Sequence, residues 1–225
     1  MAPALSIVVP ALDEAAGIVA TLQALAPLRA RGAELIVVDG GSADATTRLA
    51  APLADAVLQA ARGRARQMNA GAAAARGELL LFVHADTRLP EAADALLRDA
   101  VARGAQWGRF DVRIAGRPPL LRVVAALMNE RSRLSGIATG DQAIFVRREL
   151  FQRIGGFPDQ PLMEDVELSL RLRALARPCC LRQRVTTSGR RWEARGVWRT
   201  IFLMWRLRWR YWRGESAQTL AEAYR

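Results

Sequence analysis

The sequence predicts an α/β fold in which a mostly parallel central sheet is flanked by helices. In the first half of the chain, short runs of Val, Ile and Leu alternate with stretches whose apolar residues follow helical spacing, an order typical of βα units. The chain has 225 residues, is 51% hydrophobic and contains no linker rich in Pro, Gly or Ser. We therefore expect residues 1–225 to form one domain around a sizeable core.

Four strands are expected in the first half, each a short apolar run, at residues 5–10, 35–38, 56–58 and 79–83. Helical spacing predicts helices at 15–29 and 64–75, and another helix that begins near Ser42, whose side chain suits an N-cap. The run at 79–83 is apolar throughout, which favours a central strand covered on both faces.

Beyond Pro90 the pattern is less regular, and we expect this half of the sheet to be mixed. A helix is predicted between Pro90 and Arg103. Further strands are expected at 110–114 and 143–146, with an edge strand at 181–187. Further helices are expected at 120–133, 164–176 and 197–212.

The charge of the chain is concentrated near its C-terminus. The net charge is +11, all 33 basic residues are Arg, and residues 182–213 hold ten of them against one acid, Glu193. The two cysteines, Cys179 and Cys180, are adjacent, which suits neither a metal site nor a loop-closing disulfide. No window reaches the roughly 18 apolar residues of a membrane span, and no signal-peptide pattern precedes the first strand, so we expect a cytoplasmic protein.

Acidic residues follow three of the predicted strands. Ligands of open α/β sheets bind outside the carboxyl ends of the strands, so Glu14, Asp39 and Asp86 are the first candidates for a site. The Asp39 carboxylate could accept a hydrogen bond from a pyrimidine N–H or a ribose hydroxyl, or it could cap the turn at Gly40. Glu14 would be favourable at a helix start even without a ligand.

The segment His84-Ala85-Asp86 directly follows the run at 79–83. Mg²⁺ and Mn²⁺ often take only one or two carboxylates, with phosphate oxygens and water as the other ligands, so Asp86 alone could join such an ion to a diphosphate. His84 is the only histidine, and packing against the backbone explains it as well as a role at the metal does. A zinc site is not expected, because no second His or nearby Cys is present.

A basic turn and two later acids are further candidates. Residues 62–69 lead into a helix, where Arg66 and the helix N-terminus could hold phosphate oxygens, although a solvated helix face is the simpler reading. Asp141 and Asp165 stand at the starts of predicted elements, where either could serve as a general base toward an acceptor hydroxyl. For Asp165 the alternative is a stabilising acid in the first turn of a helix.

In their order and spacing, five segments resemble the family 2 glycosyltransferases of the GT-A fold. They are residues 8–14, 37–44, 84–86, 140–142 and 164–165. Each segment alone is weak, but the ordered set is specific and extends over roughly residues 5–195. Residues 163–169 and 188–192 also resemble a compact bacterial subgroup, the radical-SAM/selenodomain-associated transferases.

The resemblance implies a Rossmann-like nucleotide-binding half at about residues 5–104, an acceptor and catalytic half at 105–195, and a basic aromatic helix at 196–225. It also implies one role for each candidate residue. The residues that would contact the nucleoside are Pro10, Ala11, Glu14 and Asp39. Arg66 would bind the pyrophosphate, Asp86 would bind Mn²⁺ or Mg²⁺, and Asp165 would be the catalytic base. The acceptor side would be formed by Asp141, Glu164 and Trp192.

The activity implied by the resemblance is transfer of one sugar, with inversion, from a nucleoside diphosphate sugar to an acceptor hydroxyl that the sequence does not identify. UDP is favoured as the nucleotide, and GDP is the alternative. Two segments depart from the family pattern: Asp-x-Asp is replaced by His84-Ala85-Asp86, and Gln-x-x-Arg-Trp by residues 188–192. The second departure and the lack of membrane spans argue against a processive polymer synthase.

The basic C-terminal stretch leaves two interpretations open. Five of the six Trp lie within residues 182–213, interleaved with Arg, as in a helix that rests on an anionic membrane surface beside a lipid-linked acceptor. Packing of the apolar face on the core is the equal alternative.

Two other classes of function are weighed against the transferase. Arg and Trp together also suit a nucleic-acid-binding protein, but that class leaves the acids at the strand ends unexplained. A sugar nucleotidylyltransferase is disfavoured, because the turn after the first strand is not rich in Gly and the chain has no Lys.

Overall fold

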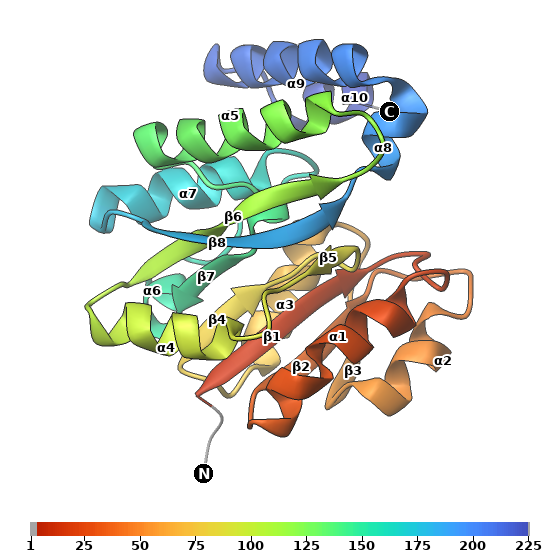
Figure 1. Ribbon diagram of the computed structural model, residues 1–225, viewed down its shortest axis with the longest axis vertical. Helices are drawn as coiled ribbons and strands as arrows, with labels where there is room; N and C mark the ends of the chain where they lie inside the picture. The colour runs from red at the N-terminus through yellow and green to blue at the C-terminus, as the bar shows by residue number, and fades with distance from the viewer. Residues whose placement is uncertain (1–3, 225) are drawn as a thin grey trace.

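The computed structural model describes residues 4–224, so residues 1–3 and 225 of the expected single domain lie outside the described part. Figure 1 shows a central sheet with helices on both faces, the N-terminal strands at one end and the C-terminal helices at the other. The α/β class predicted from the sequence is confirmed. The strands are β1 (Leu5–Ala11), β2 (Glu34–Asp39), β3 (Ala56–Gln59), β4 (Leu79–Phe82), β5 (Thr87–Arg88), β6 (Trp107–Ala115), β7 (Ile144–Arg147) and β8 (Cys179–Ser188).

The helices follow the predicted spacing closely, with two short additions that the sequence did not indicate, α6 and α8. The helices are α1 (Ile18–Ala30), α2 (Thr46–Ala50), α3 (Arg64–Ala74), α4 (Ala93–Ala102), α5 (Leu120–Ser135), α6 (Arg148–Arg153), α7 (Glu164–Leu175), α8 (Arg190–Arg195), α9 (Val197–Trp212) and α10 (Ala217–Tyr224). The C-terminal helix expected at 196–225 is divided into two helices, α9 and α10. Two 3₁₀ turns, η1 (Ala51–Leu53) and η2 (Gly140–Gln142), complete the set.

The sheet has the strand order β3-β2-β1-β4-β7-β6-β8-β5. Strand β1 pairs in parallel with β2 and β4, and β2 pairs in parallel with β3. Strand β7 is antiparallel to both of its neighbours, β4 and β6, whereas β8 runs parallel to β6. The carboxyl ends of β1, β2 and β4 therefore share one edge, and the second half is mixed as predicted.

Strand β8 is not the edge strand that the sequence analysis expected. The two-residue strand β5 pairs with it in antiparallel orientation and forms the edge instead. The hydroxyl of Thr87 donates a hydrogen bond of 3.2 Å to that of Thr187 across this pair. So short a strand has no periodicity that a sequence pattern could reveal.

Alternate residues of each strand face two different cores, because successive side chains of a strand point to opposite faces. Ile7 and Val9 of β1 belong to a core that includes α1, α4 and α5. Val8 belongs to a second core that includes α3, α6 and α7. Both faces of the first strands are covered, which explains why their sequences are apolar throughout.

The start of α2 also differs from the expectation. Ser42 does not cap this helix, which begins at Thr46. The Ser42 hydroxyl instead donates to the Asp39 carboxylate and accepts a 2.9 Å hydrogen bond from the backbone N–H of Asp13. Ser42 therefore ties the turn after β2 to the turn after β1, and the connection to α2 is longer than predicted.

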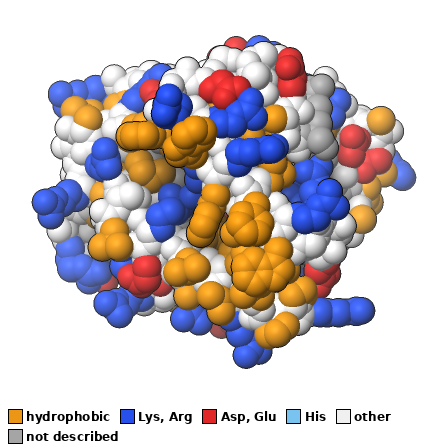
Figure 2. All heavy atoms as spheres, turned by 90° about the horizontal axis from the view of Figure 1, so that it is seen from above, with side chains coloured by type: hydrophobic (Ala, Val, Ile, Leu, Met, Phe, Trp, Pro, Cys, Tyr) orange, Lys and Arg blue, Asp and Glu red, His pale blue; other side chains and the backbone are white. Residues whose placement is uncertain are grey.

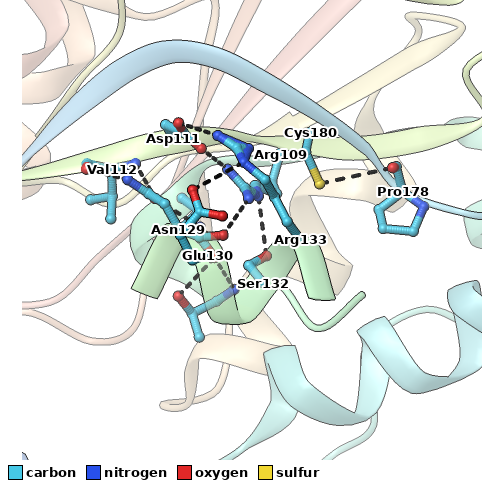
Figure 3. A network of polar contacts seen from close by, with 11 residues as sticks. Arg109, Asp111, Val112, Asn129, Glu130, Ser132, Arg133, Pro178 and Cys180 are labelled. Atoms are coloured by element: carbon cyan, nitrogen blue, oxygen red, sulfur yellow. Dashed lines mark hydrogen bonds and ion pairs between the residues drawn. The ribbon is translucent and has the colours of Figure 1, made fainter. Parts of the chain in front are cut away.

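A buried polar network attaches α5 to β6 (Figure 3). The guanidinium of Arg109 is fully buried and donates to Ser132 Oγ at 3.1 Å and to the carbonyl oxygen of Asn129 at 2.9 Å. The Asn129 side chain in turn bonds both backbone groups of Val112, and it accepts a 3.3 Å hydrogen bond from Gln142 of η2. Because these groups satisfy one another, the network fixes the position of α5 relative to the turn η2.

Candidate active site

A cavity of about 910 Å³ lies at the carboxyl ends of β1 and β4. Its walls come from the turn after β1, the start of α3, the turn after β4, η2 and the start of α7. Helices α5, α8 and α9 also contribute lining residues. The cavity therefore stands where the topology of an open α/β sheet favours ligand binding.

The structure brings most of the sequence-predicted site residues to this cavity. Those that line it are Pro10, Ala11, Glu14, Asp86, Asp141, Glu164, Asp165 and Trp192. They come from segments far apart in the sequence, so the fold assembles them into one place. Asp39 and Arg66 are not among the lining residues.

Asp39 stabilises the turn after β2. Its side chain is buried, and its carboxylate accepts hydrogen bonds from the backbone N–H groups of Gly41 at 2.9 Å and Ser42 at 3.0 Å. This is the turn-capping alternative considered from the sequence. Asp39 thus stabilises the turn beside the cavity and does not line the cavity itself.

Arg66 points away from the cavity and pairs with Asp159. Its Nε lies 2.7 Å from Asp159 Oδ1, and both side chains are more than half exposed. Arg64, two residues earlier at the first position of α3, lines the cavity instead, as do Arg62 and Gly63. Gly63 has a φ of 137°, a conformation that side chains rarely adopt, and this turns the chain into the helix.

Gln67 is a cavity residue that the sequence analysis did not single out. Its side-chain amide donates to the carbonyl oxygen of Ala11 at 2.7 Å and to that of Val38 at 2.8 Å. It also packs on Gly40, where a Cβ would come within 3.0 Å of it. Gln67 therefore holds together the carboxyl ends of β1 and β2. The sequence did not indicate this role, because a single Gln on a predicted helix belongs to no recognisable motif.

Two carboxylates that line the cavity after β1 and β4 share one arginine. Arg190 Nη2 lies 3.3 Å from Glu14 Oε2 and 3.8 Å from Asp86 Oδ2. All three side chains remain partly exposed, Glu14 at 26% and Asp86 at 31%. Among residues 4–224, no cluster of three or more His, Cys, Asp or Glu groups could hold a metal by itself.

Two carboxylates nevertheless suit a hard cation that completes its shell with phosphate oxygens and water. Glu14 and Asp86 supply such a donor set, and the single positive charge of Arg190 offsets only one of its two negative charges. The residues present therefore fit Mg²⁺ or Mn²⁺ bound together with a diphosphate, and they do not fit a protein-only metal cage.

His84 packs against the η2 turn. Its Nδ1 lies 3.4 Å from Asp141 Oδ1, and a Cβ on Gly140 would come within 2.4 Å of its Nε2. Burial acts to raise the pKa of Asp141, but the hydrogen bond with His84 and the nearby positive charges outweigh it, so the net shift is downward. Asp141 is therefore ionised at neutral pH. Position 140 requires glycine, because a side chain there would collide with the His84 ring.

Asp165 and Glu164 open helix α7 with different environments. Asp165 Oδ2 accepts a 2.8 Å hydrogen bond from the backbone N–H of Gly140, and its carboxylate lines the cavity. Glu164 is 6% exposed, and burial together with the negative charge of Asp165 raises its pKa to about 7. The oriented carboxylate of Asp165 thus lies next in sequence to Glu164, a carboxyl group whose pKa is raised.

The family to which the chain belongs follows from a comparison of its sequence with protein-family models. The model of glycosyl transferase family 2 matches residues 6–152, well over half of the chain. The chain belongs to glycosyl transferase family 2. No curated protein sequence matches it significantly.

Solved structures share the fold of this family 2 chain at low sequence identity. Residues 1–349 of TarS from S. aureus, in complex with UDP, match with a TM-score of 0.66 and 18% identity over 84% of this chain and 60% of that one. The mannosyltransferase PcManGT from Pyrobaculum calidifontis, in complex with GDP-Man and Mn²⁺, gives 0.60 and 21% over 83% and 57%.

Glucosyl-3-phosphoglycerate synthase from Mycobacterium tuberculosis, in complex with Mn²⁺, UDP and phosphoglyceric acid, gives a TM-score of 0.61 and 22% identity over 82% of this chain and 69% of that one. These matches establish the GT-A fold that the sequence motifs implied. The family 2 chain spans 61% of the TarS fragment and 37% of the longer TarS chain. The narrower resemblance to the bacterial subgroup stays a prediction.

Proposed function

We propose that this chain transfers one sugar from a nucleoside diphosphate sugar to an acceptor hydroxyl and inverts the anomeric carbon. The observation that carries the proposal is that one cavity holds both a group suited to phosphates, formed by Arg64, Glu14 and Asp86, and an oriented carboxylate, Asp165. A transferase needs both halves in one space, because donor and acceptor must react while held together.

The donor is assigned to the edge of the sheet formed by β1, β2 and β4. Pro10 and Ala11 line the cavity there, and Asp39 stabilises the adjoining turn. The N-terminus of α3 and Arg64 are placed to hold the pyrophosphate oxygens. UDP is favoured over GDP, and structures with this fold have been solved with UDP-GlcNAc and with GDP-Man.

A divalent cation is assigned to Asp86 with help from Glu14. Mn²⁺ is the ion in the PcManGT structure and in that of the mycobacterial synthase. When bound, such an ion stabilises the charge of the departing diphosphate. Arg190, which pairs with both carboxylates, would be released toward the phosphates.

The base that activates the acceptor is assigned to Asp165. The hydrogen bond from Gly140 holds its Oδ2, and the cavity leaves the carboxylate accessible. The acceptor hydroxyl gives its proton to Asp165 while its oxygen forms a bond to the anomeric carbon. The bond between that carbon and the nucleoside diphosphate breaks on the opposite face, its electron pair leaves with the diphosphate, and the configuration is inverted.

The acceptor side is assigned to Asp141, Glu164 and Trp192, which line the cavity around Asp165. We assign one sugar per cycle to the chain, because residues 188–192 lack the motif of processive synthases. Among residues 4–224, no helix is long and apolar enough to cross a membrane. We treat the two halves and the C-terminal helices as one domain, since the cavity takes its walls from all three parts.

We also propose that α9 rests on an anionic membrane surface. Its outer side chains Trp198, Phe202, Trp209 and Trp212 are each at least 58% exposed. Figure 2 shows hydrophobic side chains gathered on this end of the molecule with arginines around them. Indole rings favour the headgroup region and arginines favour anionic lipid, so a bilayer is the partner that suits both.

A donor-release assay tests the proposed activity. The protein is incubated with Mn²⁺ and with UDP-glucose, UDP-GlcNAc or GDP-mannose, and free nucleoside diphosphate is measured with and without a bacterial lipid extract as a source of acceptors. We expect one donor to be consumed and the extract to accelerate its consumption. Pyrophosphate production from a sugar phosphate and a nucleoside triphosphate, with no donor consumed, would instead identify a nucleotidylyltransferase.

A further inference from the structure

Helices α5 and α9 contribute two matching stripes to the cavity. On α5, Val124, Leu127 and Met128 line it, followed by Arg131. On α9, the stripe is Ile201, Met204 and Trp205, followed by Arg208. In both helices the lining residues recur at the third, fourth and seventh positions, so each stripe lies on one helix face and runs from apolar to cationic.

The apolar part of these stripes forms a groove that is open to solvent. Leu127 and Trp205 line the cavity, yet they are 60% and 65% exposed. Val124 at the base of the groove is 7% exposed. An exposed apolar surface that continues into a cavity is typical of a binding groove rather than of a solvated face.

The cationic ends of the stripes have no anionic partner at hydrogen-bonding distance. Nε and Nη2 of Arg131 are buried without any hydrogen bond. Among the described residues, Arg208 likewise has no ion pair or hydrogen bond, although fourteen ion pairs engage other arginines, aspartates and glutamates, and one histidine. A buried donor without a partner is costly unless a ligand supplies the acceptor.

The two guanidinium groups lie close enough to repel each other. Burial and the charge of Arg208 lower the pKa of Arg131 to about 10. Burial also lowers the pKa of Arg208, while Asp165 acts in the opposite direction on both groups. At neutral pH both remain charged, so the end of the groove beside Asp165 holds two cationic groups to which no acceptor among the described residues is hydrogen-bonded through the Nε and Nη2 of Arg131.

We infer that the acceptor is an anionic amphiphile, whose phosphate or carboxylate group binds Arg131 and Arg208 and whose apolar part lies along the groove between α5 and α9. This inference rests on the proposed function and adds the substrate class. The anionic group would neutralise both arginines and give Arg131 its missing acceptors, while the apolar part would cover Leu127 and Trp205. An acceptor hydroxyl close to the anionic group would then lie beside Asp165.

The donor phosphates already have other partners, because Arg64, the start of α3 and the carboxylate pair at Arg190 stand on the wall formed by β1 and β4. Arg131 and Arg208 come from other elements, α5 and α9, and both are close enough to Asp165 for its charge to act on them. The two cationic groups therefore belong to different elements of one cavity, as separate donor and acceptor sites require.

Calorimetric titration of the full chain, saturated with Mn²⁺ and UDP, tests the inference with three probes: octyl phosphate, methyl phosphate and 1-octanol. We expect octyl phosphate to bind the wild type, and the other two to bind at least about tenfold more weakly, because each lacks one half of the interaction. Arg131→Gln and Arg208→Gln should each weaken octyl phosphate about tenfold or more, since a charge-assisted hydrogen bond is lost.

Arg206→Gln is the matched control, because Arg206 is an exposed arginine of α9 that does not line the cavity. It should leave octyl phosphate affinity unchanged, and thermal melting checks that all three variants are folded. If methyl phosphate binds as tightly as octyl phosphate, the groove plays no part and the inference is overturned. It is also overturned if octyl phosphate binding is unaffected in Arg208→Gln, or if octyl phosphate displaces UDP.

The titration keeps the inference and the proposed function apart, because UDP binding is measured first in every variant. Failure of UDP and GDP to bind the wild type would count against the donor site itself. UDP binding that persists in Arg131→Gln and Arg208→Gln, with octyl phosphate affinity lost, is the result that the inference predicts. UDP binding with no affinity for octyl phosphate in the wild type would remove the inference alone.

Discussion

The carboxylate of Asp165 accepts a 2.8 Å hydrogen bond from the backbone N–H of Gly140. This bond joins the first turn of α7 to the η2 turn, and it leaves the carboxylate on the cavity wall. The η2 turn is held in place by Gln142, which bonds to Asn129 of α5. A general base needs this kind of fixed orientation, because misplacement by about 1 Å can greatly reduce the rate.

Asp165→Asn should abolish sugar transfer and preserve donor binding. An amide keeps the size of the side chain and can still accept from Gly140, but it cannot take a proton from the acceptor. We expect kcat to fall by about 10² to 10⁴. Donor affinity, measured by calorimetry with UDP and Mn²⁺, should change less than about twofold. An equal loss of binding and turnover would show that Asp165 holds the donor.

Arg64→Gln and Arg66→Gln form a matched pair for the phosphate site. Arg64 lines the cavity, whereas Arg66 pairs with Asp159 outside it. We expect Arg64→Gln to weaken UDP affinity about tenfold, the cost of one charged hydrogen bond, and Arg66→Gln to leave it nearly unchanged. If a titration with UDP shows that Arg66→Gln weakens the affinity more than Arg64→Gln does, the pyrophosphate is bound by Arg66, as the sequence motif suggested.

Asp86→Ala should remove the dependence of nucleotide binding on metal. In the wild type, Mn²⁺ should strengthen UDP binding, and in the variant the affinities with and without Mn²⁺ should coincide. Asp99→Ala is the control, since it removes an exposed acid of α4 that pairs only with Arg103. If UDP binds the wild type equally well with Mn²⁺ and with EDTA, Asp86 holds no metal and the arginines of the cavity bind the diphosphate without one.

Glu164→Gln should change how stability depends on pH. Its pKa in the folded protein is raised from 4.5 to about 7, so its stabilising contribution is complete below pH 4.5 and is lost as the pH rises to 7. Relative to the wild type, Glu164→Gln should therefore gain stability between pH 5 and 8, by about 3 kcal/mol at most. Urea unfolding at these two pH values measures it, and parallel changes in both proteins would contradict the raised pKa.

Replacement of the exposed aromatic residues of α9 should reduce membrane binding without changing donor affinity. Trp209 and Trp212 are 58% and 79% exposed and do not line the cavity. We expect Trp209→Ser with Trp212→Ser to lower co-sedimentation with vesicles containing phosphatidylglycerol at moderate salt, while Leu175→Ser, at an exposed apolar site on α7, does not. If the wild type does not bind the vesicles at all, the aromatic face of α9 has a partner other than a membrane.

Much of the fold could be predicted from sequence because its strands and helices have strong periodicity. The runs at 5–10, 35–38 and 79–83 are buried on both faces and so are apolar throughout. Strand β5 and helix α6, by contrast, contain two and six residues, too few to show a period. Their formation depends on pairing with distant segments, which a local pattern does not contain.

The candidate site could be predicted where residues stand at strand ends, as Glu14 and Asp86 do. For arginines on helices, the outcome depended on which face of the helix each side chain occupies. Arg64 and Arg66 are two positions apart on α3 and point in different directions, so the motif alone did not distinguish them. Arg131 and Arg208 were missed because each looks like a solvated arginine until two helices distant in sequence are brought to one cavity.

The most direct test of the donor site is a calorimetric titration of the wild type with UDP, GDP and ADP, each with Mn²⁺ and with EDTA. A site that recognises one base and holds a metal-bound diphosphate should bind either UDP or GDP, and Mn²⁺ should increase the affinity for that nucleotide. The same site should not bind ADP. If no nucleoside diphosphate binds under either condition, the cavity at β1 and β4 is not a donor site and the proposed transferase activity is contradicted.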